Sequence, residues 1–402
     1  MYEKNNIAII NSCCQGSTGK IASGLLEYLL RANNNVVLCY GRGDKYIDEN
    51  HYRIDSILEV YFHVLMSRLF GAQGTYSRFA TKRLLHLLKK RKVDLIYGIG
   101  LHGYYLNEKM LFEFIAERNI RFIYIMVDEY PFLGKCCYND NCINYLHGCG
   151  NCPQIHHYPK SLFLDRSRLI YKIKENAYPR LKRSVFVGPQ YTILAARKSP
   201  LLKQIKTEIL DEAIDINFFY PRDVKTLRNN LGIREDKIVL VCIASMANVR
   251  KGCIYFLEAA KQLEEDDRFI FIHVGYSGNL ANCPSNFIPI RYEKDQEKLA
   301  RYYSLADLFV FPSLLDTMPN TCLEALACGS PLLCFNISGM PYIADESVAN
   351  FVEPRNVSQM VNVIREISKK NEDIITRCRE YAKQRYDNKK YYQRLLEIGR
   401  NI

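Results

Sequence analysis

The chain has 402 residues, of which 48% are hydrophobic, so it can bury two cores of ordinary domain size. Its longest apolar stretch, residues 57–70, contains Glu59, His63 and Arg68 and therefore cannot span a bilayer. The formal net charge of +12 would suit nucleic acid, an anionic membrane surface or an anionic substrate. No signal peptide is visible, so we expect a soluble, cytoplasmic protein whose cysteines are mostly reduced core residues.

A glycine-rich loop follows the first predicted strand, residues 7–11. Its sequence is Cys-Cys-Gln-Gly-Ser-Thr-Gly-Lys, and a helix is predicted after it over residues 21–30. Glycines let backbone amides approach a phosphate or a sugar hydroxyl without a Cβ in the way. A P-loop does not fit, because its first glycine would stand at Cys14. A purely structural turn is the alternative.

The next helical region, residues 56–92, combines apolar residues at helical spacing with many basic ones. A basic amphipathic helix of this kind is typical of proteins that bind an anionic membrane surface. The alternative is that the basic residues form an ordinary solvent-exposed helix face. The basic residues are Arg68, Arg78, Lys82, Arg83, Lys89, Lys90, Arg91 and Lys92.

Two strands of the first domain, residues 93–99 and 121–127, lead directly to polar residues. His102 follows the first of them and Asp128 the second. Gly98, Gly100 and Gly103 spell G-x-G-x-x-G, but Tyr-Tyr-Leu-Asn then delays the helix that the dinucleotide fingerprint requires. A dehydrogenase is therefore not favoured.

A cysteine-rich loop, residues 136–152, follows Asp128. Cys136, Cys142, Cys149 and Cys152 are separated by five, six and two residues, and the last pair forms a C-x-x-C knuckle like those of structural zinc sites. Cys137 could replace Cys136, and reduced thiols or a labile disulfide are the alternatives. No basic recognition helix follows at finger spacing, so we expect no nucleic acid partner.

In the second domain, a strand over residues 237–244 is followed by Arg250 and Lys251, just before a helix over residues 253–263. Cations at this place could neutralise a departing diphosphate. Solvated cations at a helix start are the alternative. The strand over residues 287–292 could hold a nucleotide base along its edge, and Arg291 lies at its end.

The most informative stretch is residues 313–331. A short buried strand, residues 308–312, precedes it, and a helix is predicted from Asn320 until Gly329. Asp316 and Glu324 are eight residues apart and could face one ligand, and the amides of residues 320–322 are expected to be unpaired, which favours a diphosphate. The alternative is an ordinary strand–loop–helix connection whose two carboxylates are exposed to solvent and bind no ligand.

Residues 316–331 resemble the E-x7-E signature of retaining, family 4 glycosyltransferases of the GT-B fold. In this segment an acidic residue is followed by seven further residues and then by Glu-Ala-Leu-Ala-x-Gly-x-Pro. Asp316 stands where most members have Glu. The resemblance covers nearly the whole chain. It implies an α/β fold of two Rossmann-like, doubly wound parallel-sheet domains facing across a cleft: an acceptor-side domain (residues 1–206), a nucleotide-sugar donor domain (residues 207–380) and a C-terminal helix returning to the first domain (residues 381–402).

His102 and Asp128 also resemble motifs of a family branch that serves colanic acid, capsule and exopolysaccharide assembly, although Val127 and Tyr130 depart from it. The resemblance implies the catalytic residues His102, Asp128, Arg250, Lys251, Asp316 and Glu324. The last four would also bind the donor, together with Gly16, Ser17, Thr18, Gly19, Arg291, Thr317, Met318, Pro319, Asn320 and Thr321.

The resemblance therefore implies a retaining glycosyltransferase that moves a sugar from a UDP- or GDP-linked donor to a saccharide or lipid-linked acceptor in bacterial surface polysaccharide assembly. No Asp-x-Asp pair is present to hold Mg²⁺, so we expect catalysis without a metal cofactor. Its expected place is the cytoplasm, with peripheral contact to the inner face of the membrane. A nucleotide-sugar binding protein without catalysis is the alternative.

Overall fold

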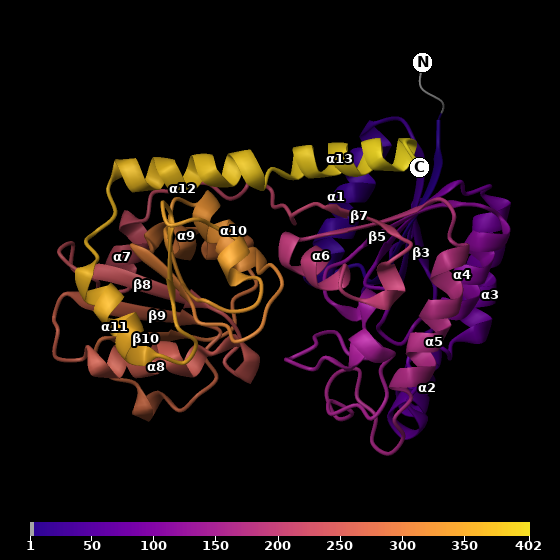
Figure 1. Ribbon diagram of the computed structural model, residues 1–402. Helices are drawn as coiled ribbons and strands as arrows, with labels where there is room; N and C mark the ends of the chain where they lie inside the picture. The colour runs from indigo at the N-terminus through magenta and orange to yellow at the C-terminus, as the bar shows by residue number, and fades with distance from the viewer. Residues whose placement is uncertain (1–3) are drawn as a thin grey trace. The chain divides into compact units, whose positions relative to one another are not determined.

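A computed structural model describes residues 4–402, which divide into two compact units. The first unit extends to Leu210 and includes Tyr392–Ile402, and the second comprises Asp211–Tyr391. Each unit contains one parallel β-sheet with helices packed on it (Figure 1), which confirms the predicted α/β class with two doubly wound sheets. No helix among residues 4–402 is both long enough and apolar enough to cross a membrane.

The sheet of the first unit has seven strands in the order β3-β2-β1-β4-β5-β6-β7, and each neighbouring pair is parallel. Parallel strands present all their carboxyl ends at one edge, which is where loops of this architecture bind ligands. The strands are β1 Asn6–Cys13, β2 Asn35–Arg42, β3 His51–Arg53, β4 Leu95–Ile99, β5 Arg121–Ile125, β6 Ser184–Gly188 and β7 Lys206–Ile209.

Helices cover both faces of this first sheet. Buried residues of α3, α4 and α5 share one core with Ile96 of β4. The next residue, Tyr97, points to the opposite face, where its hydroxyl donates to the carbonyl of Leu395 in α13 at 3.1 Å. The helices are α1 Gly16–Arg31, α2 Ile57–Phe70, α3 Arg78–Lys90, α4 Glu108–Glu117, α5 Ser167–Ala177, α6 Gln190–Ala196 and α13 Asn388–Arg400, most of which belongs to this unit.

The second unit has a six-stranded sheet in the order β10-β9-β8-β11-β12-β13, again with every neighbouring pair parallel. Its strands are β8 Ile238–Ile243, β9 Phe269–Val274, β10 Phe287–Ile290, β11 Leu308–Phe311, β12 Leu332–Phe335 and β13 Ala349–Val352. Its helices are α7 Lys225–Asn230, α8 Cys253–Gln262, α9 Gln296–Leu305, α10 Asn320–Ala327, α11 Val357–Glu366 and α12 Glu372–Arg385.

Central strand β8 shows how this unit builds two cores. Alternate side chains point to opposite faces of a strand, so a strand covered on both sides is apolar at every position. Leu240 and Cys242 pack with α8 and α11, whereas Val239 and Val241 pack with α9, α10 and α12. The buried sheet therefore leaves its carboxyl edge as the place for polar side chains.

Three predicted helix boundaries were wrong. Helix α1 begins at Gly16 rather than at residue 21, because the positive φ of Gly16 (76°) turns the chain directly into the helix. Gly71 (φ 69°) ends α2, so residues 56–92 form two helices. The last helix is interrupted after Tyr386, whose carbonyl accepts a hydrogen bond from the amide of Ile214 at 3.0 Å.

Candidate functional site

The connection between β11 and α10, residues 312–319, is held by two close backbone approaches within the second unit. A Cβ on Gly252 would lie 1.8 Å from the carbonyl oxygen of Pro312, and one on Gly339 would lie 1.7 Å from that of Thr317. The amide of Leu314 also donates to the carbonyl of Arg250 at 2.8 Å. The β8–α8 connection is thus fixed directly against the loop that carries Asp316.

This packing brings three predicted site residues together. Lys251 Nζ lies 2.6 Å from Asp316 Oδ2, and Arg250 Nη1 lies 3.4 Å from the same oxygen. Arg250 also donates to the carbonyl of Leu315. The side chain of Asp316 is only 9% exposed, so its charge is screened mainly by the two cations. Two positive charges against one negative charge leave this edge of the sheet attractive to an anion.

The N-terminus of α10 lies in the same connection, immediately after Asp316 and Thr317. Pro319, the N-cap residue, gives no side-chain capping bond, and the first turn contains no acidic residue. Within residues 4–402, the buried oxygens Asn320 Oδ1 and Thr321 Oγ1 have no hydrogen-bond partner. The Thr321 hydroxyl can donate to an anionic ligand, as can the free N–H groups of a helix N-terminus, whereas Asn320 Oδ1 can only accept a hydrogen bond.

One detail of the predicted anion site was wrong. The amide of Cys322 is not available to a ligand, because it donates to the carbonyl of Pro319 at 3.0 Å. The first turn of the helix closes one residue earlier than expected, so Asn320 and Thr321 carry the amides that a diphosphate could reach.

Glu324 lies one turn further along α10 and is almost fully buried. The hydroxyl of Tyr303, a buried residue of α9, donates to Glu324 Oε2 at 2.6 Å. Burial and the neighbouring carboxylate raise the pKa of Tyr303 well above its usual value, so the hydroxyl stays a donor. Tyr303 therefore fixes the orientation of Glu324, a positioning contact that the sequence did not reveal.

The other predicted donor-binding residues of this unit differ in their surroundings. Thr317 is buried in the loop, and the sulfur of Met318 accepts a bond from the amide of Glu212 at 3.3 Å. That contact ties Met318 to the chain entering the unit rather than to a ligand. Arg291 is exposed and directly follows β10. Strand β10 lies three strand positions from β11 in the sheet, which at roughly 4.8 Å per strand separates the two strands by about 14 Å.

In the first unit, the structure brings His102 and Asp128 into direct contact. Ile99 and Ile125 are paired in neighbouring strands, and each predicted residue follows three positions later. His102 Nε2 lies 2.6 Å from Asp128 Oδ2, while Asp128 Oδ1 accepts a bond from the amide of Tyr130 at 3.0 Å. The other ring nitrogen, His102 Nδ1, is buried and has no partner within residues 4–402.

Burial controls the protonation of this pair. It raises the pKa of Asp128 to about 7. Burial, with Lys174 and Arg42 as smaller causes, lowers the pKa of His102 to about 3. The His102 imidazole is therefore uncharged near neutral pH. In the tautomer whose Nε2–H donates to Asp128, its Nδ1 can accept a hydrogen bond, for example from a sugar hydroxyl.

Two neighbours of His102 carried no recognisable sequence signal. Lys174 of α5 is buried and donates to the carbonyls of Tyr130, Leu133 and Gly134. The ring of Tyr158 stands edge-on to that of His102, with centroids 5.8 Å apart. Both come from segments far along the chain, so only the fold shows that they adjoin His102.

The glycine-rich segment begins α1 at the same sheet edge, because β1 pairs with β4. Gly19 is structural, since a Cβ there would lie 2.6 Å from the carbonyl carbon of Cys14. Thr18 accepts a bond from the Asn11 amide group at 3.3 Å. Gly16 and Ser17 are exposed, and they are the members of this segment that a ligand could reach.

Comparisons with known proteins agree with this architecture. Residues 223–385 match the family described as "Glycosyl transferases group 1". The chain is similar to D-inositol 3-phosphate glycosyltransferase of Kribbella flavida, with 26% identity over 166 residues, 37% of this chain and 39% of the relative. It is also similar to "Putative colanic acid biosynthesis glycosyl transferase WcaC" of Escherichia coli K12, with 22% identity over 271 residues, 65% of each chain.

Both alignments span less than two thirds of the relative's own length. Among solved structures, sucrose-phosphate synthase of Thermosynechococcus elongatus has a TM-score of 0.69 at 16% identity, covering 99% of both chains. Anabaena Alr3699/HepE in complex with UDP and glucose has a TM-score of 0.64 at 13% identity, covering 98% of both chains. These likenesses confirm the GT-B fold, and the family match is confined to residues 223–385 of the second unit.

Proposed function

We propose that this chain is a metal-independent, retaining glycosyltransferase whose second unit binds a nucleoside diphosphate sugar. The observation that carries the proposal is the convergence of Lys251, Arg250 and Asp316 next to the uncapped N-terminus of α10. A fold neighbour that was solved in complex with UDP and glucose supports a nucleotide-sugar donor.

The proposed chemistry depends on charge that develops as the bond between sugar and diphosphate breaks. Negative charge then grows on the diphosphate, and a preorganised cation lowers the energy of the transition state more than that of the bound substrate. Lys251 and Arg250 would provide these cations, and the amides of Asn320 and Thr321 would bind the remaining oxygens. Because the protein supplies the positive charge itself, the proposal requires no divalent metal.

The two carboxylates would then have different tasks. Asp316, held by Lys251, would bind hydroxyls of the donor sugar, and Glu324, oriented by Tyr303, would bind hydroxyls of the ribose or the sugar. In the first unit, the uncharged His102 would contact the transferred sugar or the acceptor, with Asp128 fixing the ring. Retention of configuration is proposed from the resemblance of the Asp316 and Glu324 motif alone.

The acceptor is proposed to be a saccharide or a lipid-linked saccharide of bacterial surface polysaccharide. The similarity to a relative described as a colanic acid biosynthesis enzyme supports this assignment. A lipid-linked acceptor would bring the protein to a membrane surface, and helix α2 has the surface for such contact.

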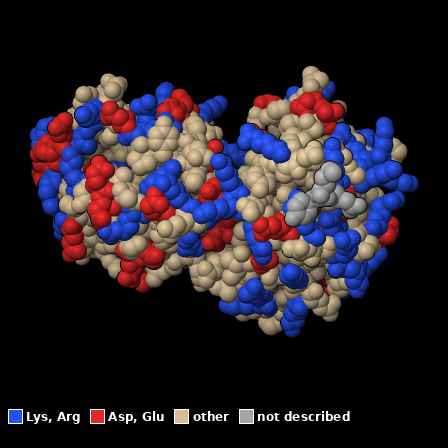
Figure 2. Space-filling view, turned by 90° about the horizontal axis from the view of Figure 1, so that it is seen from above, with Lys and Arg blue, Asp and Glu red and all other residues tan. Residues whose placement is uncertain are grey.

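The two faces of α2 are reversed with respect to a normal surface helix. His63 and Ser67 are buried against the first unit, while Leu58, Tyr61 and Phe62 are 76%, 66% and 57% exposed. The neighbouring helix α3 contributes five basic residues and no acidic one. Figure 2, which views the side away from α2, shows further Lys and Arg along the right-hand edge of the first unit. An apolar face beside cations fits an anionic membrane surface.

A panel of UDP- and GDP-sugars, assayed both by thermal shift and by sugar transfer or hydrolysis, tests the proposed activity. One nucleotide sugar should raise the melting temperature and also be consumed. A ligand at about 100 times its dissociation constant would stabilise the protein by roughly 2.7 kcal/mol. Binding without turnover would instead identify a nucleotide-sugar binding protein. If no nucleotide sugar either stabilises the protein or is consumed, the proposal is refuted.

A further inference from the structure

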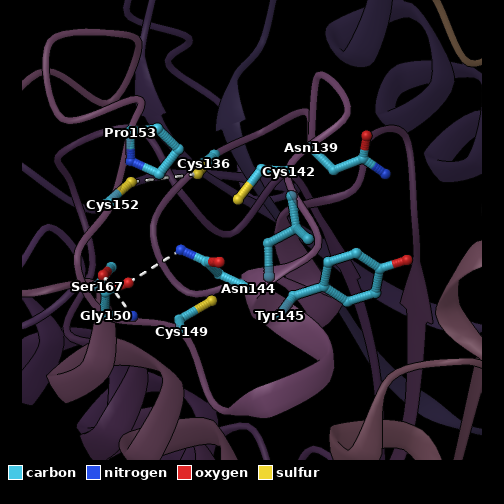
Figure 3. A pocket seen from close by; sticks show the side chains of 11 residues that line it. Cys136, Asn139, Cys142, Asn144, Tyr145, Cys149, Gly150, Cys152, Pro153 and Ser167 are labelled. Atoms are coloured by element: carbon cyan, nitrogen blue, oxygen red, sulfur yellow. Dashed lines mark hydrogen bonds between the residues drawn. The ribbon is translucent and has the colours of Figure 1, made fainter.

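The cysteine-rich loop of the first unit converges on one small pocket. Cys136, Cys142, Cys149 and Cys152 all line it, together with Asn144 and other residues of the loop (Figure 3). The sulfurs of Cys136 and Cys152 are 4.0 Å apart although the two residues are 16 positions apart in the sequence. Four thiolates around one zinc ion, each about 2.3 Å from it, would have sulfurs about 3.8 Å apart. One edge of such a tetrahedron is therefore nearly in place.

The structure also decides between two adjacent cysteines. Cys136 lines the pocket, whereas Cys137 lies with His102 and Asp128 in another group of potential ligand atoms. The loop thus offers four thiols from Cys136, Cys142, Cys149 and Cys152, and Cys137 belongs to the neighbouring polar site.

The backbone of the C-x-x-C knuckle has an unusual conformation. Gly148, Cys149, Gly150 and Asn151 all have positive φ, at 94°, 54°, 111° and 47°. Residues with a Cβ rarely adopt this region, so the conformation needs support from the surroundings. It brings Cys149 and Cys152 to the same pocket, as a shared metal ion would require.

This loop packs on the core of the first unit through Cys136 and Tyr145 but contains little regular secondary structure. Between Phe132 and Ser167 its one helical segment is the short η2 Asn144–His147. The buried ammonium group of Lys135 donates to the carbonyls of Gln154 and Ile155 at 3.2 and 3.1 Å. Zinc with four thiolates carries two net negative charges, and a buried cation beside Cys136 would offset part of them.

We propose that these four cysteines bind one structural Zn²⁺, a site that lies outside the proposed donor site of the second unit. Binding replaces four S–H bonds by four Zn–S bonds and releases four protons to solvent. As they stand, no three of the four described sulfurs lie within 4.8 Å of one another. At least two of the four sulfurs would therefore move inward when the ion binds.

The loop would transmit this anchoring to the polar site of the first unit. The amide of Glu129 donates to the carbonyl of Cys137 at 3.0 Å, and the amide of Asn139 donates to the Glu129 carboxylate at 2.5 Å. Glu129 follows Asp128 directly, so the metal-bound loop would hold the segment that presents Asp128 to His102.

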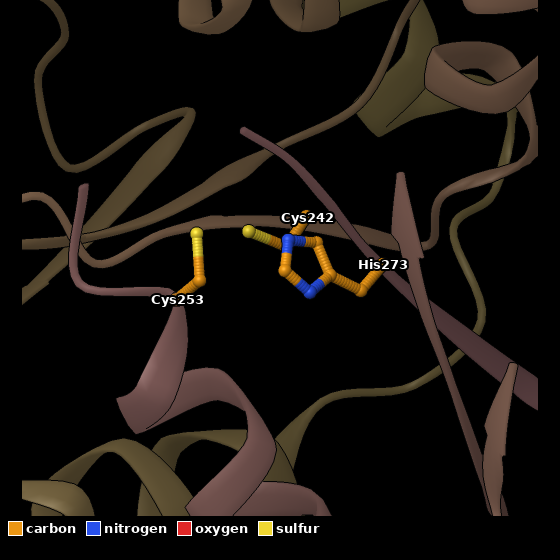
Figure 4. Close-up of side chains that lie close together, drawn as sticks. All are labelled: Cys242, Cys253 and His273. Carbon is orange, nitrogen blue, oxygen red and sulfur yellow. The ribbon is translucent and has the colours of Figure 1, made fainter. Parts of the chain in front are cut away.

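A second thiol cluster provides an internal control. Cys242, Cys253 and His273 of the second unit lie close together and are buried (Figure 4). His273 Nε2 is already 3.0 Å from the carbonyl oxygen of Ala244, and the group contains no fourth ligand atom among the described residues. These features describe a packed core rather than a closed zinc site.

Metal analysis of the full-length protein, purified without chelator, tests the proposal. We expect about one zinc per chain, lost in Cys149→Ser and Cys152→Ser and retained in Cys253→Ser. Loss of zinc only in Cys253→Ser would overturn the proposal. So would protein that contains no zinc and whose intact mass shows either a disulfide or four free thiols in the loop.

Cobalt substitution keeps the test decisive if the serine variants fail to fold. Zinc-depleted wild-type protein reloaded with Co²⁺ should show sulfur-to-cobalt charge-transfer bands and the d–d absorption of a tetrahedral thiolate site. Octahedral cobalt spectra, or an unchanged melting temperature after zinc removal, would refute a structural four-thiolate site.

Discussion

Lys251 Nζ lies 2.6 Å from Asp316 Oδ2, although the two residues are 65 positions apart in the sequence. The contact joins the β8–α8 connection to the β11–α10 connection inside one unit. It also means that the cation proposed to bind the diphosphate is partly neutralised by a carboxylate before any donor arrives.

Asp316→Asn should therefore separate binding from chemistry. Removing this negative charge should tighten the binding of UDP or GDP by a factor on the order of 10, because Lys251 and Arg250 are no longer neutralised. Transfer should nevertheless become slower, since the sugar hydroxyls lose their acceptor. Calorimetric titration and kcat measure the two effects. Weaker nucleotide binding in Asp316→Asn would show that the carboxylate does not compete with the ligand.

Tyr303→Phe should act on stability and on donor binding together. The change leaves an oxygen of the buried Glu324 carboxylate without the hydroxyl that now donates to it. Removing one hydrogen-bond donor from a buried carboxylate costs about 1–3 kcal/mol of unfolding free energy. Denaturant titration measures this loss. Tyr302→Phe on the same helix is the matched control and should change stability less, and an equal loss in both variants would contradict the role assigned to Tyr303.

Stability of the first unit should depend on pH through Glu108. Burial is the main cause that raises the pKa of this carboxyl to about 7, while Lys174 and a bond from Tyr130 oppose the rise. A carboxyl that holds its proton more tightly when folded loses stabilisation as pH rises from about 4.5 through 7. The unfolding free energy of the wild type should fall across this window, and Glu108→Gln should flatten the slope. A steeper fall in Glu108→Gln would contradict this assignment.

Contact of α2 with anionic lipid should require its outward apolar residues. Leu58→Ser with Phe62→Ser should weaken binding to vesicles that contain anionic lipid, because the apolar face then contributes less burial. Changing Lys89, Lys90, Arg91 and Lys92 to Gln should also weaken it, and added salt should weaken wild-type binding. Co-sedimentation measures the bound fraction. Equal binding to neutral and anionic vesicles would count against an electrostatic contribution.

The sequence predicted the places of polar residues at strand ends better than their partners. Buried parallel strands are continuous apolar runs, so β4, β5, β8 and β11 could be located, and the carboxyl edge of the sheet followed. The contacts of Glu324 with Tyr303 and of His102 with Tyr158 could not be predicted, because long-range packing decides them.

Helix α2 shows a different limit. Its apolar residues occur at helical spacing, but periodicity does not tell which face is buried. Inside the first unit His63 bonds to the hydroxyl of Ser77 at 2.7 Å, and this polar face turns inward instead. The start of α1 was misplaced for a local reason, since a single glycine with positive φ shortened the expected loop.

The most direct test of the proposed donor site is the rate of sugar transfer by Lys251→Ala, with Lys261→Ala on the exposed end of α8 as the control. Losing one preorganised electrostatic contact should lower kcat/KM by a factor on the order of 10² to 10³. The control should transfer sugar at the wild-type rate. If folded Lys251→Ala retains wild-type kcat/KM, the diphosphate does not bind where Lys251, Asp316 and α10 meet.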